Sequence, residues 1–278
     1  MTKLHQKRIK KTVVVLGPPR SGTSTVAGLL HILGVDMGRL RPPNPDNPKG
    51  FFEDKDFLFL MDDIFEAANP GSSGFKPPNL SSIQNQKEKF ENRIKKLVQA
   101  RCLKTNSYLW GWKVVGTNLA IELFLPYLIN PHFIVVYRNI LDTAQSCVRY
   151  TKTRERLKLE EAVELSLFYY RSILDFFRKN THLPKYFISY EAIIRNPKKE
   201  TKNLATFLEI EPTKIQLKKA KNFVIPEKIR WKERKKAVIK EYLLTRIPRF
   251  AKKCLKNPLK IPFYILKSFH SKIKERNS

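Results

Sequence analysis

The stretch VVVLGPPRSGTSTVAGLLHILG, residues 13–34 of 278, constrains the fold more than any other part of this chain. It begins with a short apolar run rich in valine, which is typical of a strand buried on both faces of a parallel sheet. Apolar residues between Val26 and Leu33 then recur with helical spacing, and Gly34 is placed to end that helix. A strand, a tight loop and a helix in this order bring loop N–H groups and the positive end of the helix dipole together, which predicts a bound anion.

The loop carries its cation at an unusual position. Gly17 and Gly22 have the separation of the Walker A sequence G-x-x-x-x-G-K-[ST], but Thr23 stands where the lysine would be. The cation of this loop is instead Arg20, whose fork-shaped guanidinium suits an anion with two oxygens. Because the two preceding prolines lack N–H groups, the backbone donors must come from Arg20 to Thr25. A plain turn with an exposed arginine remains the alternative.

The rest of the chain predicts further units of the same kind. Apolar runs at 108–116, 132–138 and 185–190 predict three more strands, with helical patterns between them. Strands that alternate with helices are typical of a parallel sheet with ligands at its carboxyl ends. We therefore predict an α/β, P-loop-like fold of three layers, with a central, mostly parallel sheet flanked by helices.

The helices and one loop can also be placed. Helical patterns cover 57–66, 159–178 and 197–208, the last with Asn196 as its N-cap. Residues 69–82 are rich in Pro, Gly and Ser and predict a loop, which near a nucleotide site would act as a lid. A further amphipathic helix follows this loop, with one apolar face formed by Ile83, Phe90, Ile94, Leu97 and Val98.

Positive charge is the unusual bulk property of the chain. Lys and Arg number 54 against 25 Asp and Glu, for a formal net charge of +29. We predict a basic N-terminal extension over 1–11, an α/β domain over 12–236, and a basic, partly amphipathic tail over 237–278. The tail mixes lysines with Leu, Ile, Phe and Tyr, as a peripheral segment on an anionic membrane would. A solvated, lysine-rich surface is the alternative.

Other features of the sequence limit the expected binding partners and the expected cellular compartment. No RNA-reading aromatic motif, zinc finger or GXXG clamp accompanies the charge, so nucleic acid is not an expected partner. The 3 cysteines are scattered, which favours a reducing compartment, and the 5 histidines lack metal-site spacing, so no metal is expected. Apolar runs are too short for a signal peptide or a membrane span, so we expect a cytoplasmic protein, at most peripheral at the inner face of a membrane.

A second anion site is predicted at the end of the strand at 132–138. Arg138 follows an apolar run where a nucleotide hydrolase would carry the Walker B aspartate, so this strand end favours an anion over Mg²⁺. Ser146, on the following helix, offers a hydroxyl donor to the same anion. Pairing of Arg138 with Asp142 on its own helix is the alternative.

Three segments carry a further signal together: PRSGTS, VYRNILDTAQS and SYEAIIRNPKKETKNLATFLEI. In this combination they resemble the PAPS-dependent sulfotransferase family, in its bacterial or glycan-directed form, over residues 12 to about 232. PAPS is 3′-phosphoadenosine 5′-phosphosulfate, and its two anionic ends match the two predicted anion sites. The resemblance implies that the 5′-phosphosulfate is held by Arg20, Ser21, Gly22, Thr23 and Ser24. It further implies that the 3′-phosphate and adenine are contacted by Arg138, Ser146, Tyr190, Lys228 and Arg230.

The last two of these residues lie in FVIPEKIRWK, which is similar to the basic stretch that closes on the 3′-phosphate in family members. The glycine-rich form of that loop found in some cytosolic members is absent from this sequence. Lys113, at the end of WGWK, resembles the strand lysine that many sulfotransferases use at the bridging oxygen. A salt bridge beside the sheet is its alternative role. The charge of a sulfuryl group predicts in-line transfer without a metal, in which Arg20 also takes part.

A hydroxyl acceptor requires a base, and two adjacent carboxylates are candidates. The KTHLP histidine of cytosolic small-molecule members has no counterpart, because this chain reads WKVVGTNL there. Glu53 in NPKGFFED resembles the glutamate of the GFFE or GYFE context in bacterial and glycan-directed members. Beside Phe51 and Phe52, desolvation is expected to raise its pKa towards neutrality. Asp54 is the rival base, and a helix-dipole role for Glu53 is the alternative.

These features predict an enzyme that moves a sulfuryl group from PAPS to an acceptor hydroxyl, with a glycan or glycolipid favoured as acceptor. Two other classes remain open. A P-loop kinase-like phosphotransferase explains the strand, loop and helix, but it requires Mg²⁺ and the missing Walker residues. A non-catalytic anion-binding scaffold at a membrane or nucleic acid explains the charge alone.

Overall fold

The computed structural model describes residues 10–43, 47, 49–151 and 156–224. All of them lie in the first of two units of the chain, residues 1–225, and the second, residues 226–278, contains no described residue. Residues 1–9 of the predicted N-terminal extension and the whole predicted tail, 237–278, lie outside the described residues, and the predicted domain boundaries stay predictions. No described helix is long and apolar enough to span a bilayer.

The described part of the chain contains a four-stranded sheet in which every strand pair is parallel. Its strands, in the spatial order β2-β1-β3-β4, are β1 Lys11–Leu16, β2 Leu109–Trp112, β3 Pro131–Tyr137 and β4 Lys185–Ser189. In the register of the central pair, Leu16 of β1 lies beside Val135 of β3. The predicted α/β architecture with a parallel sheet is therefore confirmed.

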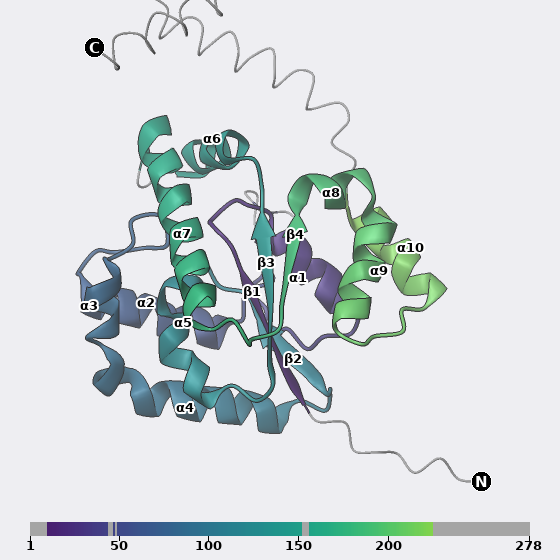
Figure 1. The fold of residues 1–278 in the computed structure, drawn as a ribbon, viewed down its shortest axis with the longest axis horizontal. Helices are drawn as coiled ribbons and strands as arrows, with labels where there is room; N and C mark the ends of the chain where they lie inside the picture. The colour runs from purple at the N-terminus through teal and green to yellow at the C-terminus, as the bar shows by residue number, and fades with distance from the viewer. Residues whose placement is uncertain (1–9, 44–46, 48, 152–155, 225–278) are drawn as a thin grey trace, which may run out of the picture. The chain divides into compact units, whose positions relative to one another are not determined.

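Helices cover both faces of this sheet (Figure 1). One layer, with its own apolar core, contains α2 Lys55–Ala68, α3 Leu80–Gln84, α4 Lys87–Lys104, α5 Thr117–Phe124, the 3-10 turn Leu125–Tyr127 and α7 Leu159–Lys179. The other contains α1 Thr23–Ile32, α8 Tyr190–Arg195, α9 Pro197–Phe207 and α10 Lys214–Phe223. Helix α6 Ile140–Thr151 packs on α7 through a third, smaller cluster.

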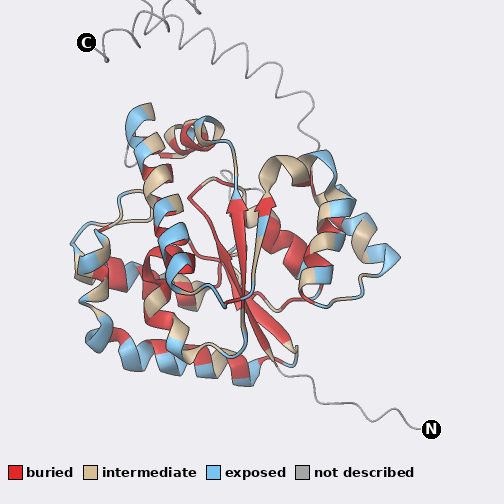
Figure 2. Cartoon of the chain, in the orientation of Figure 1, coloured by how far each residue is buried: buried red, intermediate tan, exposed pale blue. Residues whose placement is uncertain are grey.

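Strand β1 explains why two layers form. Val14 and Leu16 point into the core beneath α2, α4 and α5, whereas Val13 and Val15 point into the core beneath α1. All four side chains are buried, because successive residues of a strand face opposite sides of the sheet. Figure 2 shows the sheet as the buried centre of the described chain. The valine-rich run thus anchors both helical layers.

Some predicted element bounds differ from those observed. The strand expected at 108–116 ends at Trp112, because Val114 accepts a turn hydrogen bond from Thr117 and the positive φ of Gly116 (93°) starts α5. The single helix expected through Ile83 and Phe90 is split into α3 and α4, although both residues bury in the same core.

The predicted cap of α9 is correct in position and different in chemistry. Asn196 is the N-cap and Pro197 the first helical residue, as expected, but the side chain of Asn196 makes no capping hydrogen bond within the described chain.

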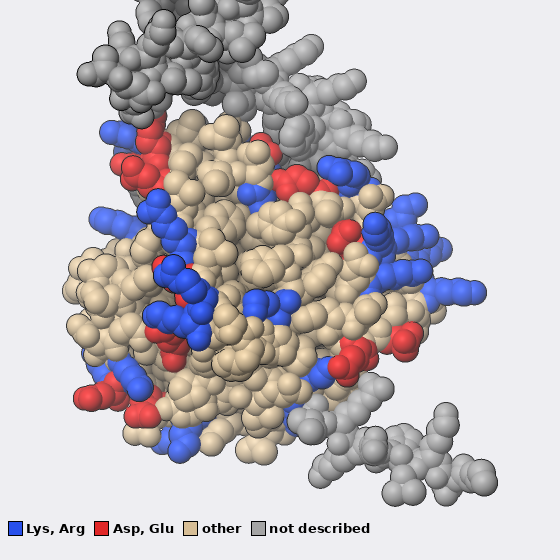
Figure 3. All heavy atoms as spheres, viewed as in Figure 1, with Lys and Arg blue, Asp and Glu red and all other residues tan. Residues whose placement is uncertain are grey.

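The lysines of α9 and α10 are all exposed. Figure 3 shows them gathered on one side of the molecule. Cys102 and Cys147 are buried free thiols, and Cys254 lies outside the described residues.

The aromatic packing between α2 and β2 gives a direct test of the fold. Phe57 is fully buried and stacks on Trp112 with ring centroids 4.2 Å apart. We expect Phe57→Ala to lower the free energy of unfolding by about 3 to 5 kcal/mol, because it removes this contact and leaves a cavity.

Phe59, on the same helix, provides the matched control because its side chain is 58% exposed. Phe59→Ala should change the free energy of unfolding by about 0.5 kcal/mol or less. Urea unfolding followed by circular dichroism measures both variants. Equal losses for the two would contradict the described packing of α2.

Candidate active site

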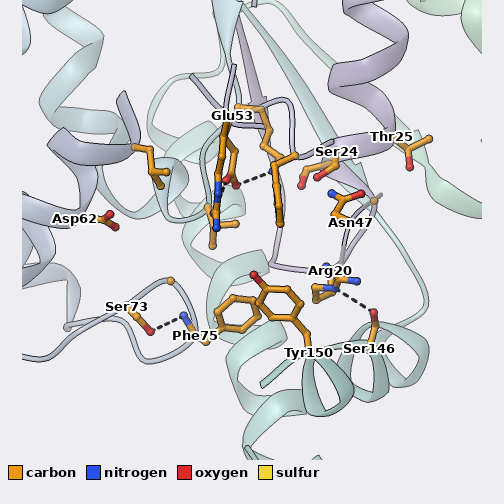
Figure 4. Close-up of a pocket in the computed structure, with 18 of the residues that line it drawn as sticks. Arg20, Ser24, Thr25, Asn47, Glu53, Asp62, Ser73, Phe75, Ser146 and Tyr150 are labelled. Atoms are coloured by element: carbon orange, nitrogen blue, oxygen red, sulfur yellow. Dashed lines mark hydrogen bonds and ion pairs between the residues drawn. The ribbon is translucent and has the colours of Figure 1, made fainter. Parts of the chain in front are cut away.

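A cavity of about 650 Å³ lies at the carboxyl ends of the strands (Figure 4). Its lining includes a residue from the segment after each strand: Arg20 after β1, Lys113 after β2, Arg138 after β3 and Tyr190 after β4. Parallel strands direct their following loops to one edge of the sheet, which is where α/β folds bind ligands. One cavity therefore joins the two anion sites predicted separately from the sequence.

The loop after β1 delivers an uncapped helix end to the cavity. Gly22 is the N-cap of α1, with φ of 102°, and it has no side chain to bond the first-turn N–H groups. Gly22, Thr23 and Ser24 all line the cavity. The positive end of α1 is thus directed at the space where a ligand anion would lie.

Ser21 lies differently from its neighbours. Its hydroxyl donates to the Pro18 carbonyl at 2.8 Å and its N–H donates to the same oxygen at 3.2 Å. The side chain is fully buried and does not line the cavity. Ser21 therefore braces the loop in this structure, and direct contact between Ser21 and a donor stays a prediction.

Gly22 is required by its surroundings as well as by its backbone angle. A Cβ atom built on Gly22 would lie 2.2 Å from Cδ2 of Tyr190, inside the contact limit of real atoms. A residue other than glycine would also be strained at its φ of 102°. The tight approach of Tyr190 to the loop explains how the end of β4 reaches the same cavity as the end of β1.

Arg20 is fixed by two contacts from α6. Its Nε donates to Oγ of Ser146 at 3.2 Å, and its guanidinium lies 4.7 Å from the centre of the Tyr150 ring (Figure 4). Its own φ is 67°, a backbone conformation that favours glycine. Ser146 was expected beside Arg138; its side-chain hydrogen bond is instead with Arg20, and all three residues line the same cavity.

Arg138 contacts Arg20, Tyr170 and Tyr190, and one of its guanidinium N–H donors has no hydrogen-bond partner among the described residues. Its Nη1 donates to the Arg20 carbonyl at 3.2 Å, and its guanidinium lies 4.6 Å from the centre of the Tyr190 ring. Its backbone N–H donates to the hydroxyl of Tyr170 at 3.0 Å. Among the described residues, its buried Nε has no hydrogen-bond partner, and no ion pair joins it to Asp142. This orphaned donor fits a ligand anion.

Tyr170 holds the backbone of Arg138 in both directions. Burial raises the pKa of Tyr170 to about 12, so its hydroxyl stays protonated and also donates to the Arg138 carbonyl at 3.3 Å. Sequence patterns gave no indication of Tyr170, which is 32 residues away from Arg138 along the chain. A tyrosine on an amphipathic helix is not distinguishable from a core residue before its partner is known.

Glu53 and Lys113 form a buried ion pair in the centre of the cavity. Nζ of Lys113 lies 2.8 Å from Oε1 of Glu53, and Nη1 of Arg41 lies 3.4 Å from Oε2. Both Glu53 and Lys113 are nearly inaccessible to solvent. Two cations therefore compensate one buried carboxylate, which would otherwise be costly to desolvate. Arg41, which the sequence analysis did not single out, also covers the Phe51 ring at 4.2 Å.

Asp54 faces away from this cavity. It is the N-cap of α2, where its carboxylate accepts the Asp56 N–H at 2.9 Å and pairs with Nε of Arg101 at 3.1 Å. Burial raises the pKa of Asp54, although its backbone hydrogen bonds and Arg101 act in the opposite direction. Of the two adjacent carboxylates considered as bases, only Glu53 lines the cavity.

The described residues therefore place most of the predicted site together. Lys228 and Arg230 lie outside the described residues, so their roles stay predictions. Within the described chain, no group of three or more His, Cys, Asp or Glu side chains has the arrangement of a metal site. The uncapped N-terminus of α1 and the neighbouring Arg20 and Arg138, with its orphaned Nε, fit a ligand with two anionic ends.

One comparison with known proteins shows the family of this chain. A family model described as "Sulfotransferase domain" matches residues 10–255. No curated protein matches the chain significantly.

Several solved structures are similar to this chain at low identity. The sulfotransferase domain from the curacin biosynthetic pathway is 17% identical over 76% of this chain and 77% of its own, with a TM-score of 0.46. Sulfotransferase STF9 from Mycobacterium avium is 17% identical over 78% and 68%, with a TM-score of 0.44. A sulfotransferase from Alicyclobacillus acidocaldarius is 15% identical over 85% and 94%, with a TM-score of 0.45.

Replacement of Gly22 tests the geometry of the loop. We expect Gly22→Ala to weaken binding of adenosine 3′,5′-bisphosphate by about tenfold or more, because the new Cβ displaces Tyr190 and the loop from each other. Isothermal titration calorimetry measures the affinity, and circular dichroism checks that the variant is folded.

Gly34 supplies the control at the other end of the same helix. Its φ is 95°, close to that of Gly22, but a Cβ built on it meets no atom within 4 Å. Gly34→Ala therefore imposes similar backbone strain away from the cavity and should leave the affinity unchanged. A parallel loss of affinity in both variants would show that strain alone is responsible.

Proposed function

Because this chain belongs to the sulfotransferase domain family, we propose that it transfers a sulfuryl group from PAPS to a hydroxyl of an acceptor, with a glycan or glycolipid favoured. The observation that carries the proposal is the direct bond between the two anion sites, Nη1 of Arg138 to the carbonyl of Arg20 at 3.2 Å. A single ligand with an anion at each end can therefore occupy both sites at once.

In this proposal the donor lies along the carboxyl edge of the sheet. The 5′-phosphosulfate binds at the uncapped N-terminus of α1, where the N–H groups around Gly22 and the Arg20 guanidinium meet it. The 3′-phosphate takes the orphaned Nε of Arg138 and the hydroxyl of Ser146. The adenine lies beside the Tyr190 ring.

The chemical step is an in-line displacement at sulfur. The acceptor oxygen forms the new bond to sulfur while the bond from sulfur to the bridging phosphate oxygen breaks, and adenosine 3′,5′-bisphosphate leaves with that electron pair. Glu53 takes the proton of the acceptor hydroxyl, and Lys113 stabilises the charge that develops on the bridging oxygen. A sulfuryl group carries less negative charge than a phosphoryl group, so fewer cations are needed.

The ion pair between Glu53 and Lys113 couples these two events. While Glu53 is charged, its Oε1 holds Nζ of Lys113 at 2.8 Å. When Glu53 accepts the proton it loses its charge, and the ammonium of Lys113 is released from its partner as the leaving oxygen becomes negative. Arg41, on the other carboxylate oxygen, keeps Glu53 oriented during the change.

Substitution of Glu53 tests the proposed base. Glu53→Gln keeps the shape of the side chain and removes its ability to accept a proton, so transfer should fall by about a hundredfold or more. Binding of adenosine 3′,5′-bisphosphate, measured by calorimetry, should persist. Transfer is measured with PAPS and cell-extract acceptors, by mass spectrometry for products heavier by one SO₃ group.

The exposed Glu88 on α4 is outside the cavity, and Glu88→Gln is the matched control. Undiminished sulfuryl transfer by the Glu53 variant would remove Glu53 from the role of base. Failure of the unaltered protein to bind the bisphosphate, together with EDTA-sensitive transfer from ATP, would instead favour a phosphotransferase.

A further inference from the structure

Helix α2 presents one face to the part of the cavity that the donor would not fill. Lys55, Leu58, Phe59 and Asp62 all line the cavity, at positions i, i+3, i+4 and i+7 of this helix. Phe59 is 58% exposed, although it is a large aromatic side chain. An exposed aromatic residue between two charged ones, all facing a cavity, is the pattern of a surface for an amphipathic ligand.

Asp62 is unusual among the acidic residues near this cavity. Within the described part of the chain it has neither an ion pair nor a hydrogen bond, in a protein with a formal net charge of +29. The helix explains why, since the residues three and four positions away are Leu58, Phe59, Phe65 and Glu66. The adjacent Asp63, by contrast, pairs with Arg93 at 2.6 Å.

The charges that face Asp62 leave it uncompensated. Burial raises the pKa of Asp62, and the negative charges of Glu53 and Asp63 raise it further, while Arg41 alone opposes them. Arg41 is already engaged with Glu53. Asp62 is exposed to solvent at the cavity, so a cation brought by a ligand could reach its carboxylate, which has no partner among the described residues.

Asp62 and the donor site lie at opposite sides of the cavity. In Figure 4, Arg20 and Ser24 lie on one side of Glu53 and Asp62 lies on the other. The lining carries five cations, Arg20, Arg41, Lys55, Lys113 and Arg138, against the two carboxylates Glu53 and Asp62. A bound PAPS, with about four negative charges, would more than match the net positive charge of this lining. An anionic acceptor would then be repelled and a cationic one attracted.

One wall of the cavity is apolar and firmly held. Phe75 and Val115 line the cavity, and Phe75 stacks on Tyr150 with ring centroids 5.1 Å apart. The loop that carries Phe75 is fixed by the Tyr169 hydroxyl, which donates to the Gly74 carbonyl at 2.8 Å. This wall is suited to the apolar face of a ring or an alkyl chain.

We propose that the acceptor is an amphipathic hydroxyl compound with a protonated amine, and that Asp62 binds this amine. The proposal rests on the proposed sulfuryl transfer and names the substrate class of that same cavity. The reacting hydroxyl lies at Glu53 and Lys113, the apolar face rests on Phe59 and Phe75, and the amine pairs with Asp62. Asp62 is thus a specificity-determining residue that takes no part in the proton transfer.

Two pairs of probes test the proposal and distinguish two sources of the amine. For an amino sugar, the pair is fully deacetylated chitobiose and N,N′-diacetylchitobiose. For an aryl alkylamine, it is 4-hydroxyphenethylamine and its N-acetyl form. Acetylation removes the positive charge and retains the hydroxyl groups. Binding to the full chain, saturated with adenosine 3′,5′-bisphosphate, is measured by calorimetry at pH 7, so that no turnover is needed.

We expect at least one amine to bind about tenfold or more tightly than its acetylated partner, as for a charge-assisted hydrogen bond. Asp62→Asn should abolish this preference and leave the affinity for the bisphosphate unchanged. Asp63→Asn, the neighbouring control outside the cavity, should keep it.

The proposal is overturned if neither amine binds more tightly than its acetylated form, including the case in which neither binds. It is also overturned if the Asp62 variant retains the preference. Failure of the proposed function is recognised by a different result, namely that the protein does not bind adenosine 3′,5′-bisphosphate. In that case the probes are titrated without nucleotide, and the same comparison of amine with acetylated partner decides the role of Asp62.

Discussion

The parallel pairing of β1 with β3 is the constraint on which the site depends. With Leu16 beside Val135, both strands end at the same edge of the sheet, and the segments that follow them carry Arg20 and Arg138. The hydrogen bond between these two residues then joins the strand ends. The polar residues at this edge stay in place because the valine-rich β1 is buried on both faces by two separate helical layers.

A second arrangement divides the cavity by charge. The centre holds Glu53 between Lys113 and Arg41, the donor side holds Arg20 and Arg138, and Asp62 lies on the far side. Lys113 and Arg41 share the single carboxylate of Glu53, whereas the buried Nε of Arg138 on the donor side has no hydrogen-bond partner among the described residues, which suits an anionic donor. The proposed division into donor and acceptor sides follows from this distribution, because opposite charges in one cavity select opposite ends of the substrates.

Strand ends were the most predictable part of the site, because a parallel sheet brings them together wherever they lie in the sequence. Arg138 was found in this way, whereas Lys113 was found through its resemblance to the strand lysine of many sulfotransferases, and both line one cavity. Contacts made by side chains far apart in the chain could not be predicted, as with Tyr170 and Arg138. Glu53 and Asp54 differ by one position, yet only Asp54 caps α2, a role that an aspartate before a helical pattern does signal.

The central claim is that one ligand bridges the two arginines, and a comparison of three nucleotides tests it most directly. Calorimetry should be performed with adenosine 3′,5′-bisphosphate, adenosine 5′-monophosphate and adenosine 3′-monophosphate under the same ionic strength. The account predicts that the bisphosphate binds about a hundredfold or more tightly than either monophosphate, because each phosphate occupies its own site. Equal affinity for the bisphosphate and one monophosphate would contradict it, since one of the two arginines would then bind no phosphate.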